Sequence, residues 1–132
     1  MDPILARFQP RIPDARRFAL ERRVLLVETT DAVPIDIALG GLPYEGRVVA
    51  RSSPFEVAAG MALTTCSAED LVILKAFAGR AQDWIDIEGI LVRQAGWLDR
   101  DLVLAELRLL LDLKEDAETE PRLITLFQKH PG

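Results

Sequence analysis

Five charged residues stand in segments that are otherwise built mainly of apolar or small side chains: Asp36, Lys75, Arg80, Asp83 and Asp86. Carboxylates hold Mg²⁺ in proteins, and a bound Mg²⁺ bridges phosphate groups. Lysine and arginine neutralise the phosphate charge that the metal leaves. The residue types therefore suit metal-dependent phosphoryl or nucleotidyl transfer.

A helix that begins after Ser67 and ends at Gly79 is predicted to carry Lys75. Ser67 and Asp70 resemble a capping box, and Gly79 is a natural helix stop. Lys75 follows Leu71 by four residues, so it lies on or beside the stripe that faces the core. We therefore expect the ammonium group of Lys75 either to lie near an anion or to reach water. The alternative is that its stem only snorkels past the leucines.

A second helix is predicted to open near Gln82 or Asp83. It places Asp83 and Asp86 on one face, because residues three apart are neighbours on a helix. With Lys75 and with Arg80 in the turn, two cations and two carboxylates gather at a helix-turn-helix corner. A purely structural alternative stays open, in which Asp83 caps its helix and Asp86 pairs with Arg80 across the corner.

Asp36 lies in the middle of a predicted strand whose opposite face is apolar at every second residue. Its own face also carries Pro34 and Ala38. A carboxylate under a packed layer is costly, so this face is expected to line a cleft or to meet a cation. The alternative is an aspartate that faces water on a one-sided antiparallel sheet.

The pattern predicts an α+β protein, with a short mixed or antiparallel sheet followed by a C-terminal helical bundle. The 132 residues are expected to form a single domain, sheet-containing over 1–66 and helical over 67–132. Predicted strands cover residues 24–28, 33–39, 48–51, 55–58 and 61–65. Predicted helices follow Asp14, Ser67, Gln82 or Asp83, Asp99 and Thr119, after a short helix or extended arm at the N-terminus.

Composition excludes several functions. With 16 basic and 21 acidic residues, the net charge of −5 argues against an extended nucleic-acid footprint. Four arginines of the predicted helix after Asp14 form a basic face, either solvated or in contact with phosphate or RNA. Cys66 is expected to be a small buried residue, and His130 is too near the C-terminus to serve Ser-His or Cys-His catalysis. No run is apolar enough to span a membrane and no signal-peptide pattern is present, so a cytoplasmic setting is the default.

The segment 100–114 is rich in leucine, and its apolar residues cover most of the helix circumference. One core-facing stripe needs fewer. Either this helix is central to the C-terminal bundle, or one of its sides meets a partner.

The residues VPIDIALGGLPYE, followed by an apolar hairpin and then SAEDLVILKAFAGRAQDWIDIEGIL, resemble the minimal nucleotidyltransferases of the AbiEii/AbiGii-type (type IV toxin) family. These proteins share the DNA polymerase β-like fold. The likeness covers roughly residues 23–94 and implies metal-dependent transfer of a nucleotide from an NTP to an RNA or protein acceptor. It assigns Asp36 as catalytic residue and Mg²⁺ ligand. It places Lys75, Arg80, Asp83 and Asp86 on the nucleotide side, and implies Mg²⁺ and NTP as cofactors and an antitoxin as partner.

The sequence also departs from the family. Family members begin with a Gly-rich patch and a paired Asp-x-Asp, yet no Asp-x-Asp precedes Asp36 and no glycine precedes Val24. We therefore expect the chain to be truncated and to show little or no transfer activity, because one carboxylate rarely holds a catalytic Mg²⁺ pair. The alternative function is a non-catalytic binding or assembly module, or a homo-oligomer. It would act through an exposed strand edge or the leucine-rich helix.

Overall fold

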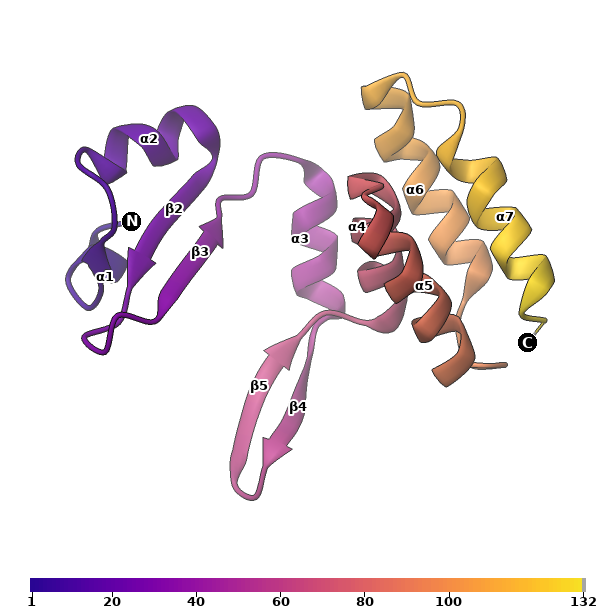
Figure 1. Cartoon of the computed structure of the whole chain (residues 1–132), viewed down its shortest axis with the longest axis horizontal. Helices are drawn as coiled ribbons and strands as arrows, with labels where there is room; N and C mark the ends of the chain where they lie inside the picture. The colour runs from indigo at the N-terminus through magenta and orange to yellow at the C-terminus, as the bar shows by residue number, and fades with distance from the viewer. Residues whose placement is uncertain (132) are drawn as a thin grey trace. The chain divides into compact units, whose positions relative to one another are not determined.

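The computed structural model describes residues 1–131 and confirms the α+β class (Figure 1). Its helices are α1 (Asp2–Leu5), α2 (Ala15–Arg22), α3 (Pro43–Arg51), α4 (Ala68–Ala78), α5 (Ala81–Arg93), α6 (Arg100–Lys114) and α7 (Thr119–Lys129). Its strands are β1 (Gln9–Pro10), β2 (Val24–Glu28), β3 (Pro34–Ala38), β4 (Ser53–Ala58) and β5 (Met61–Thr65). Strands β1, β2 and β3 form one antiparallel sheet in that order, and β4 pairs with β5 in a second one.

The chain forms two compact units, Met1–Gly46 and Arg47–Gly132, which we call unit 1 and unit 2. The boundary falls inside α3, so the β4–β5 hairpin groups with the helices that follow it. The predicted single domain, with its parts 1–66 and 67–132, stays a prediction. Each unit is described by itself below.

Unit 1 is built on β2, the central strand of the three-stranded sheet. Leu25 and Val27 of β2 are fully buried and pack with Ala15 and Ala19 of α2. Ile35 and Ile37 of β3 pack against this core, as their alternation predicts. The sheet therefore has one covered face, and the opposite face of β3 is exposed.

Of two expectations for α2, one is wrong and one of its two alternatives is confirmed. The expected cap by Asp14 is wrong, because Asp14 has a left-handed backbone (φ 52°) and its side chain makes no cap hydrogen bond. A side-chain cap normally needs an extended backbone at this position. The arginines of α2 lie on a solvated face, where Arg16 pairs with Asp2 and Arg17 pairs with Glu21.

Unit 2 contains a bundle in which α4 packs on both α5 and α6, and α7 packs on α6. Its core includes Ile73, Ile87, Leu107 and Leu123, all fully buried. The predicted C-terminal helical bundle is thus confirmed. Among the described residues, no helix has the length and apolar character needed to cross a membrane.

The predicted caps of unit 2 are confirmed. Ser67 accepts a hydrogen bond from the Asp70 amide at 3.1 Å, and Asp99 accepts one from the Leu102 amide at 2.9 Å. Gly79 ends α4 with a φ of 68°, a left-handed conformation that glycine adopts without steric cost.

The predicted strand over residues 48–51 is wrong, because these residues lie in α3. The helix begins at Pro43, whose fixed φ suits a first helical position. Glu45 stabilises this end, since its carboxylate accepts hydrogen bonds from the Gly41 and Leu42 amides. The β preference of Val48 and Val49 is overridden by these helix signals and by packing.

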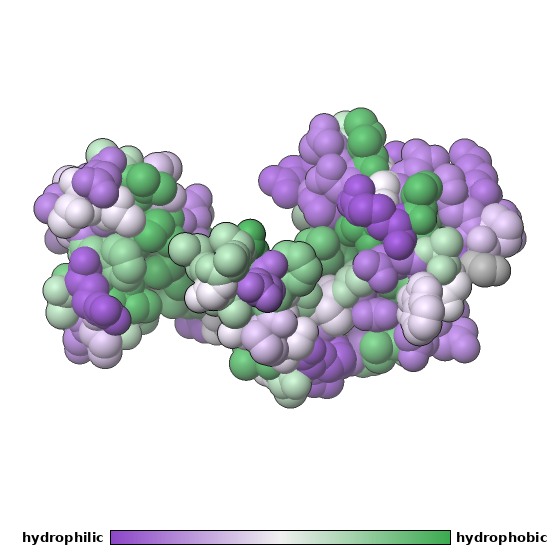
Figure 2. Space-filling model, turned by 90° about the horizontal axis from the view of Figure 1, so that it is seen from below, coloured by the Kyte–Doolittle hydropathy of each residue, from purple (hydrophilic) through white to green (hydrophobic). Residues whose placement is uncertain are grey.

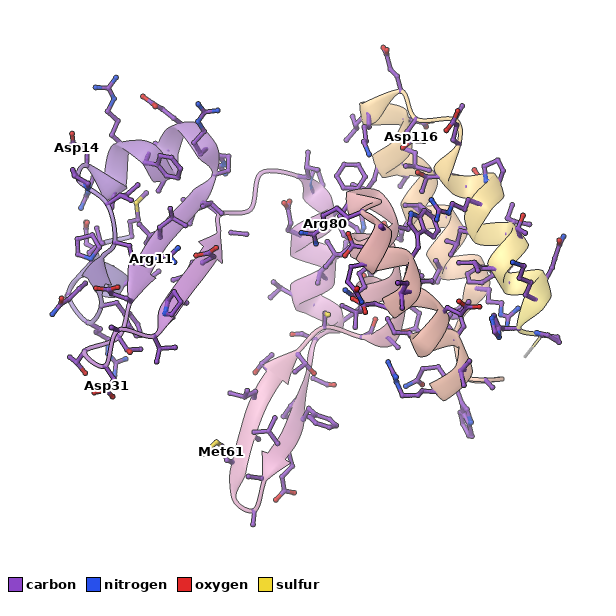
Figure 3. The ribbon with its side chains drawn as sticks, viewed as in Figure 1. Arg11, Asp14, Asp31, Met61, Arg80 and Asp116 are labelled. Atoms are coloured by element: carbon purple, nitrogen blue, oxygen red, sulfur yellow. The ribbon has the colours of Figure 1, made fainter. Side chains whose placement is uncertain are left out.

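Strands β4 and β5 match the predicted hairpin, and Gly60 forms its turn with a φ of 74°. Every residue of both strands is exposed. The side chain of Met61 points away from the ribbon into solvent (Figure 3). Cys66, which follows β5, is only half-buried rather than buried as expected, and this partial burial raises the pKa of its thiol.

Candidate functional site

Lys75 finds the anion that its position requires. It lies in the last turn of α4, and its side chain is 23% exposed. Its Nζ donates to Asp86 Oδ2 at 2.6 Å and lies 3.6 Å from Asp83 Oδ1. Lys75 therefore bridges α4 to α5 rather than only snorkelling to solvent.

Arg80 and Asp83 form the start of α5, which begins at Ala81, slightly earlier than predicted. Asp83 Oδ2 accepts the Arg80 backbone amide at 3.1 Å and the Arg80 Nε at 2.7 Å. Capping by Asp83 is thus confirmed. The alternative pairing of Asp86 with Arg80 is wrong, because Asp86 lies nearly one turn further on and faces Lys75.

The four side chains of Lys75, Arg80, Asp83 and Asp86, which we call the corner cluster, hold one another in their charged forms. Hydrogen bonding to Lys75 lowers the pKa of Asp86, and hydrogen bonding to Arg80 lowers the pKa of Asp83. The same bonds raise the pKa of Lys75 and of Arg80. Two positive and two negative charges therefore balance at neutral pH.

The cations of the corner cluster are more accessible than its central carboxylate. The Arg80 side chain is 78% exposed, whereas the Asp83 side chain is 3% exposed. Arg80 donates hydrogen bonds to Asp83 through Nε and Nη2, and its Nη1 makes no hydrogen bond to the described residues. Arg80 lies at the turn between α4 and α5 (Figure 3), so its free donors can reach a ligand from solvent.

A polar pocket of about 220 Å³ opens beside Gly79 and Trp84, and its lining includes two cations and two carboxylates that the sequence did not single out: Lys114, Arg122, Asp116 and Glu118. Lys114 Nζ donates to the Phe77 carbonyl at 3.1 Å. Arg122 stacks on the Trp84 ring, with its guanidinium carbon 4.1 Å from the ring centre. Both residues come from helices far along the chain, so no local spacing could have revealed them.

A larger pocket, of about 730 Å³, lies elsewhere, between α6 and α7. Its lining includes Asp112, Glu115, Asp116 and Glu120 against one arginine, Arg108. An acidic lining repels phosphate. Pocket size therefore does not mark the candidate site. The pocket beside Gly79 has as many carboxylates as cations, so the candidate site rests on the corner cluster itself.

Asp36 belongs to unit 1, so the corner cluster forms the candidate site of unit 2 without it. The side chain of Asp36 is 65% exposed and forms an ion pair with Arg11. This exposure matches the alternative of an aspartate that faces water on a one-sided antiparallel sheet, and the cation that Asp36 meets is one of the protein's own.

The described residues do not fit a catalytic Mg²⁺. Such an ion needs several oxygen ligands that converge on it. Asp36 is a single carboxylate beside a guanidinium, and both carboxylates of the corner cluster are bound to cations. Over residues 1–131, no group of three or more His, Cys, Asp or Glu could hold a metal ion.

A second charge cluster, which we call the inner cluster, joins three helices of unit 2: Arg47, Arg51, Asp70 and Glu106. Arg51 donates to Asp70 at 2.6 and 2.9 Å and to Glu106 at 3.0 Å. Arg47 donates to Glu106 at 2.6 and 2.9 Å. Asp70 is fully buried and Glu106 nearly so. Sequence reasoning missed this cluster because it placed Arg51 in a strand.

Comparison with known proteins leaves the function to be argued from the site. No protein-family model matches the sequence, and no curated protein matches it.

Proposed function

We propose that this protein is nucleotidyltransferase-like and that its corner cluster contacts the phosphates of an NTP. The observation that carries the proposal is the convergence of Lys75 and Arg80 at one helix corner, with Arg80 donors open to solvent. Four of the five residues to which the family resemblance gives a role thus lie together in unit 2, and the fifth, Asp36, belongs to unit 1.

Each residue has a role in this proposal. Lys75 and Arg80 neutralise phosphate oxygens, and Asp83 and Asp86 hold these cations in position until phosphate competes for them. The resemblance gives Asp36 the part of metal ligand and catalytic residue. Transfer needs more oxygen ligands than Asp36 supplies, so we propose nucleotide contact, rather than transfer, as the activity of these 132 residues.

The family resemblance also motivates the setting of the proposal. It implies a cytoplasmic protein of a toxin–antitoxin pair, an RNA or protein acceptor, and Mg²⁺ with NTP as cofactors. The proposals on setting, acceptor and cofactors rest on the family resemblance.

Titration calorimetry with ATP tests the proposed contact. We expect binding to the unmodified chain and binding at least roughly tenfold weaker in Lys75→Ala and Arg80→Ala, because each removes a charge-assisted hydrogen bond. Arg108→Ala is the matched control, since Arg108 forms an exposed ion pair with Glu120 on another part of unit 2. Equal affinity in all four proteins contradicts the proposal.

A transfer assay tests the second part. With radiolabelled NTP, Mg²⁺ and candidate RNA or protein acceptors, we expect no labelled product. Robust labelling that Asp36→Ala abolishes would show that these residues do complete a metal site.

A second function, assembly with a partner, is favoured by two surfaces. Helix α6 exposes Leu109 (57%) and Leu113 (68%), which are four residues apart and share one side of the helix. Within the described sheet of unit 1, β3 is an edge strand. Both are features through which proteins associate. Leu109→Lys with Leu113→Lys should lower any self-association measured by light scattering, and unchanged association would remove α6 as the interface.

A further inference from the structure

A groove of about 390 Å³ runs between α5 and α7 of unit 2. Each helix contributes four residues with the spacing i, i+3, i+4 and i+7, which places them on one face of that helix. From α5 these are Ala81, Trp84, Ile85 and Glu88, and from α7 they are Arg122, Thr125, Leu126 and Lys129. The groove thus extends over two helical turns, or roughly 10 Å, and its volume is typical of sites for small molecules.

The middle of the groove is apolar and partly open to solvent. Ile85 is 63% exposed, and Leu126 on the facing helix is half-buried. The Trp84 ring, which also lines the groove, is almost completely buried. Viewed from below, hydrophobic residues of unit 2 reach the surface among hydrophilic ones (Figure 2). An apolar ligand that covers Ile85 would remove apolar surface from water on both sides of the contact.

Arg122 gives the groove a cation whose donors are unused. Its guanidinium carbon lies 4.1 Å from the centre of the Trp84 ring, and this stacking restrains the side chain. Over residues 1–131, the Arg122 side chain makes no hydrogen bond and no ion pair. This includes Asp116 and Glu118, the two carboxylates of the pocket beside Gly79, which Arg122 also lines. A planar guanidinium with free N–H groups can bind a carboxylate through two parallel hydrogen bonds.

The remaining charges of the groove favour an anionic ligand. Lys129 stands at the other end of the α7 face, and its ammonium group makes no hydrogen bond or ion pair within the described residues. Glu88 is the one carboxylate among the described residues of the lining, and its Oε1 lies 2.9 Å from His130 Nε2. The groove therefore has two unpaired cations against one carboxylate that already has a partner, although the whole chain has a net charge of −5.

We infer that this groove binds a small organic carboxylate with an apolar body. Arg122 donates to the carboxylate, and the apolar body lies along Ile85 and Leu126. A protein partner fits less well, because two helical turns offer much less than the roughly 800 Å² that each side of a stable interface buries. The inference is independent of the proposed nucleotide contact, since Lys75 and Arg80 do not line the groove.

Nuclear magnetic resonance titrations test the inference with two probes, octanoate and 4-phenylbutyrate. We expect saturable shifts of the Ile85 methyl and Trp84 indole resonances in the millimolar range, with Overhauser contacts from the ligand to Ile85 and Leu126. Octan-1-ol lacks the charge, whereas acetate and inorganic phosphate lack the apolar body, so each should bind at least about tenfold more weakly than octanoate. Absence of saturable shifts with both carboxylates, or equal affinity for octanoate and any of the three comparison compounds, overturns the inference.

Variants separate the groove from the rest of the surface. Arg122→Gln removes the cation and Ile85→Asp places a carboxylate in the groove, so each should weaken octanoate binding at least about tenfold. Ile85 is largely exposed, so its variant should fold even if loss of the stacked arginine disturbs the other one. Arg108→Gln is the matched control, because Arg108 is an exposed arginine outside the groove, and its octanoate affinity should be unchanged. Unchanged binding in either folded groove variant, or Overhauser contacts to the exposed β4–β5 hairpin instead, overturns the inference.

Discussion

The inner cluster and the corner cluster of unit 2 have the same composition, two cations and two carboxylates, but differ in what solvent can reach. In the inner cluster both carboxylates are buried, and the side chains of Arg51 and Arg47 are 25% and 42% exposed. In the corner cluster one carboxylate is buried and the other is 36% exposed, and the side chains of Lys75 and Arg80 are 23% and 78% exposed.

We propose that this difference separates a structural role from a binding role. Arg51 joins Asp70 of α4 and Glu106 of α6 to α3, and the hydrogen bond to Asp70 is the main reason that the pKa of Arg51 is raised. Removal of Arg51 takes the paired cation away from a fully buried carboxylate, whereas removal of Asp70 leaves Arg51 paired with Glu106. The corner cluster joins only two neighbouring helices, and we propose that its exposed cation, Arg80, exchanges a carboxylate for a phosphate.

The largest expected effect is in the inner cluster. Asp70→Ala should lower the free energy of unfolding by about 3–5 kcal/mol, because it breaks a buried ion pair and removes a fully buried carboxylate. Urea denaturation followed by circular dichroism measures this loss. Arg17→Ala, which removes an exposed ion pair on α2, is the control and should change stability by less than about 1 kcal/mol. A loss below that value for Asp70→Ala would remove the distinction between the clusters.

An intermediate effect is expected at Asp116, a carboxylate held by donors at the start of α7. Its oxygens accept the Glu118 and Thr119 amides and the Thr119 hydroxyl, at 2.9 to 3.0 Å. Asp116→Ala should cost about 1–2 kcal/mol in the free energy of unfolding, as loss of a helix cap does. A cost near zero would mean that α7 is fixed by packing alone.

The same residue gives a pH dependence with a definite sign. The Thr119 amide lowers the pKa of Asp116 from 3.8 to about 2. Because the folded pKa lies below the unfolded one, the stabilisation is complete above pH 4 or so and is lost as the pH falls toward about 2. Acid titration of stability should therefore be shallower in Asp116→Ala, and identical curves would contradict the assignment.

The smallest effect on stability is expected at Lys75. Lys75→Ala should change the free energy of unfolding less than Asp116→Ala, because both carboxylates keep other partners. Asp83 remains bonded to Arg80, and Asp86 remains bonded to Gln82 and accessible to water. ATP affinity, in contrast, should fall. A variant with a large loss of stability and unchanged ATP affinity would reverse the roles of the two clusters.

The sequence predicted the corner cluster because its determinants are local. Ser67, Gly79 and the spacing of Asp83 and Asp86 set two helices and the turn between them, so four charges had to lie close together. The partner of Lys75 was less predictable, since Asp86 reaches it only through the packing of α5 on α4.

The inner cluster could not be predicted in the same way. Arg51 meets Glu106 across 55 residues of sequence, and the valines beside Arg51 favour a strand when taken alone. The helix signals of this segment stand at its start, where Pro43 suits the first helical position and Glu45 lies in the first turn. The hairpin was predicted from its alternation and turn, whereas its complete exposure depends on what unit 2 leaves uncovered.

The two tryptophans give the most direct test of the claim that the corner cluster binds a nucleotide. Trp84 is buried at the corner, and its indole N–H donates to the Gly79 carbonyl at 3.2 Å. Trp97 is 86% exposed and lies beyond the other end of α5. In a ¹H–¹⁵N spectrum titrated with ATP, we expect the Trp84 indole resonance to shift saturably while that of Trp97 stays in place. No shift at Trp84, or equal shifts at both indoles, would contradict the claim.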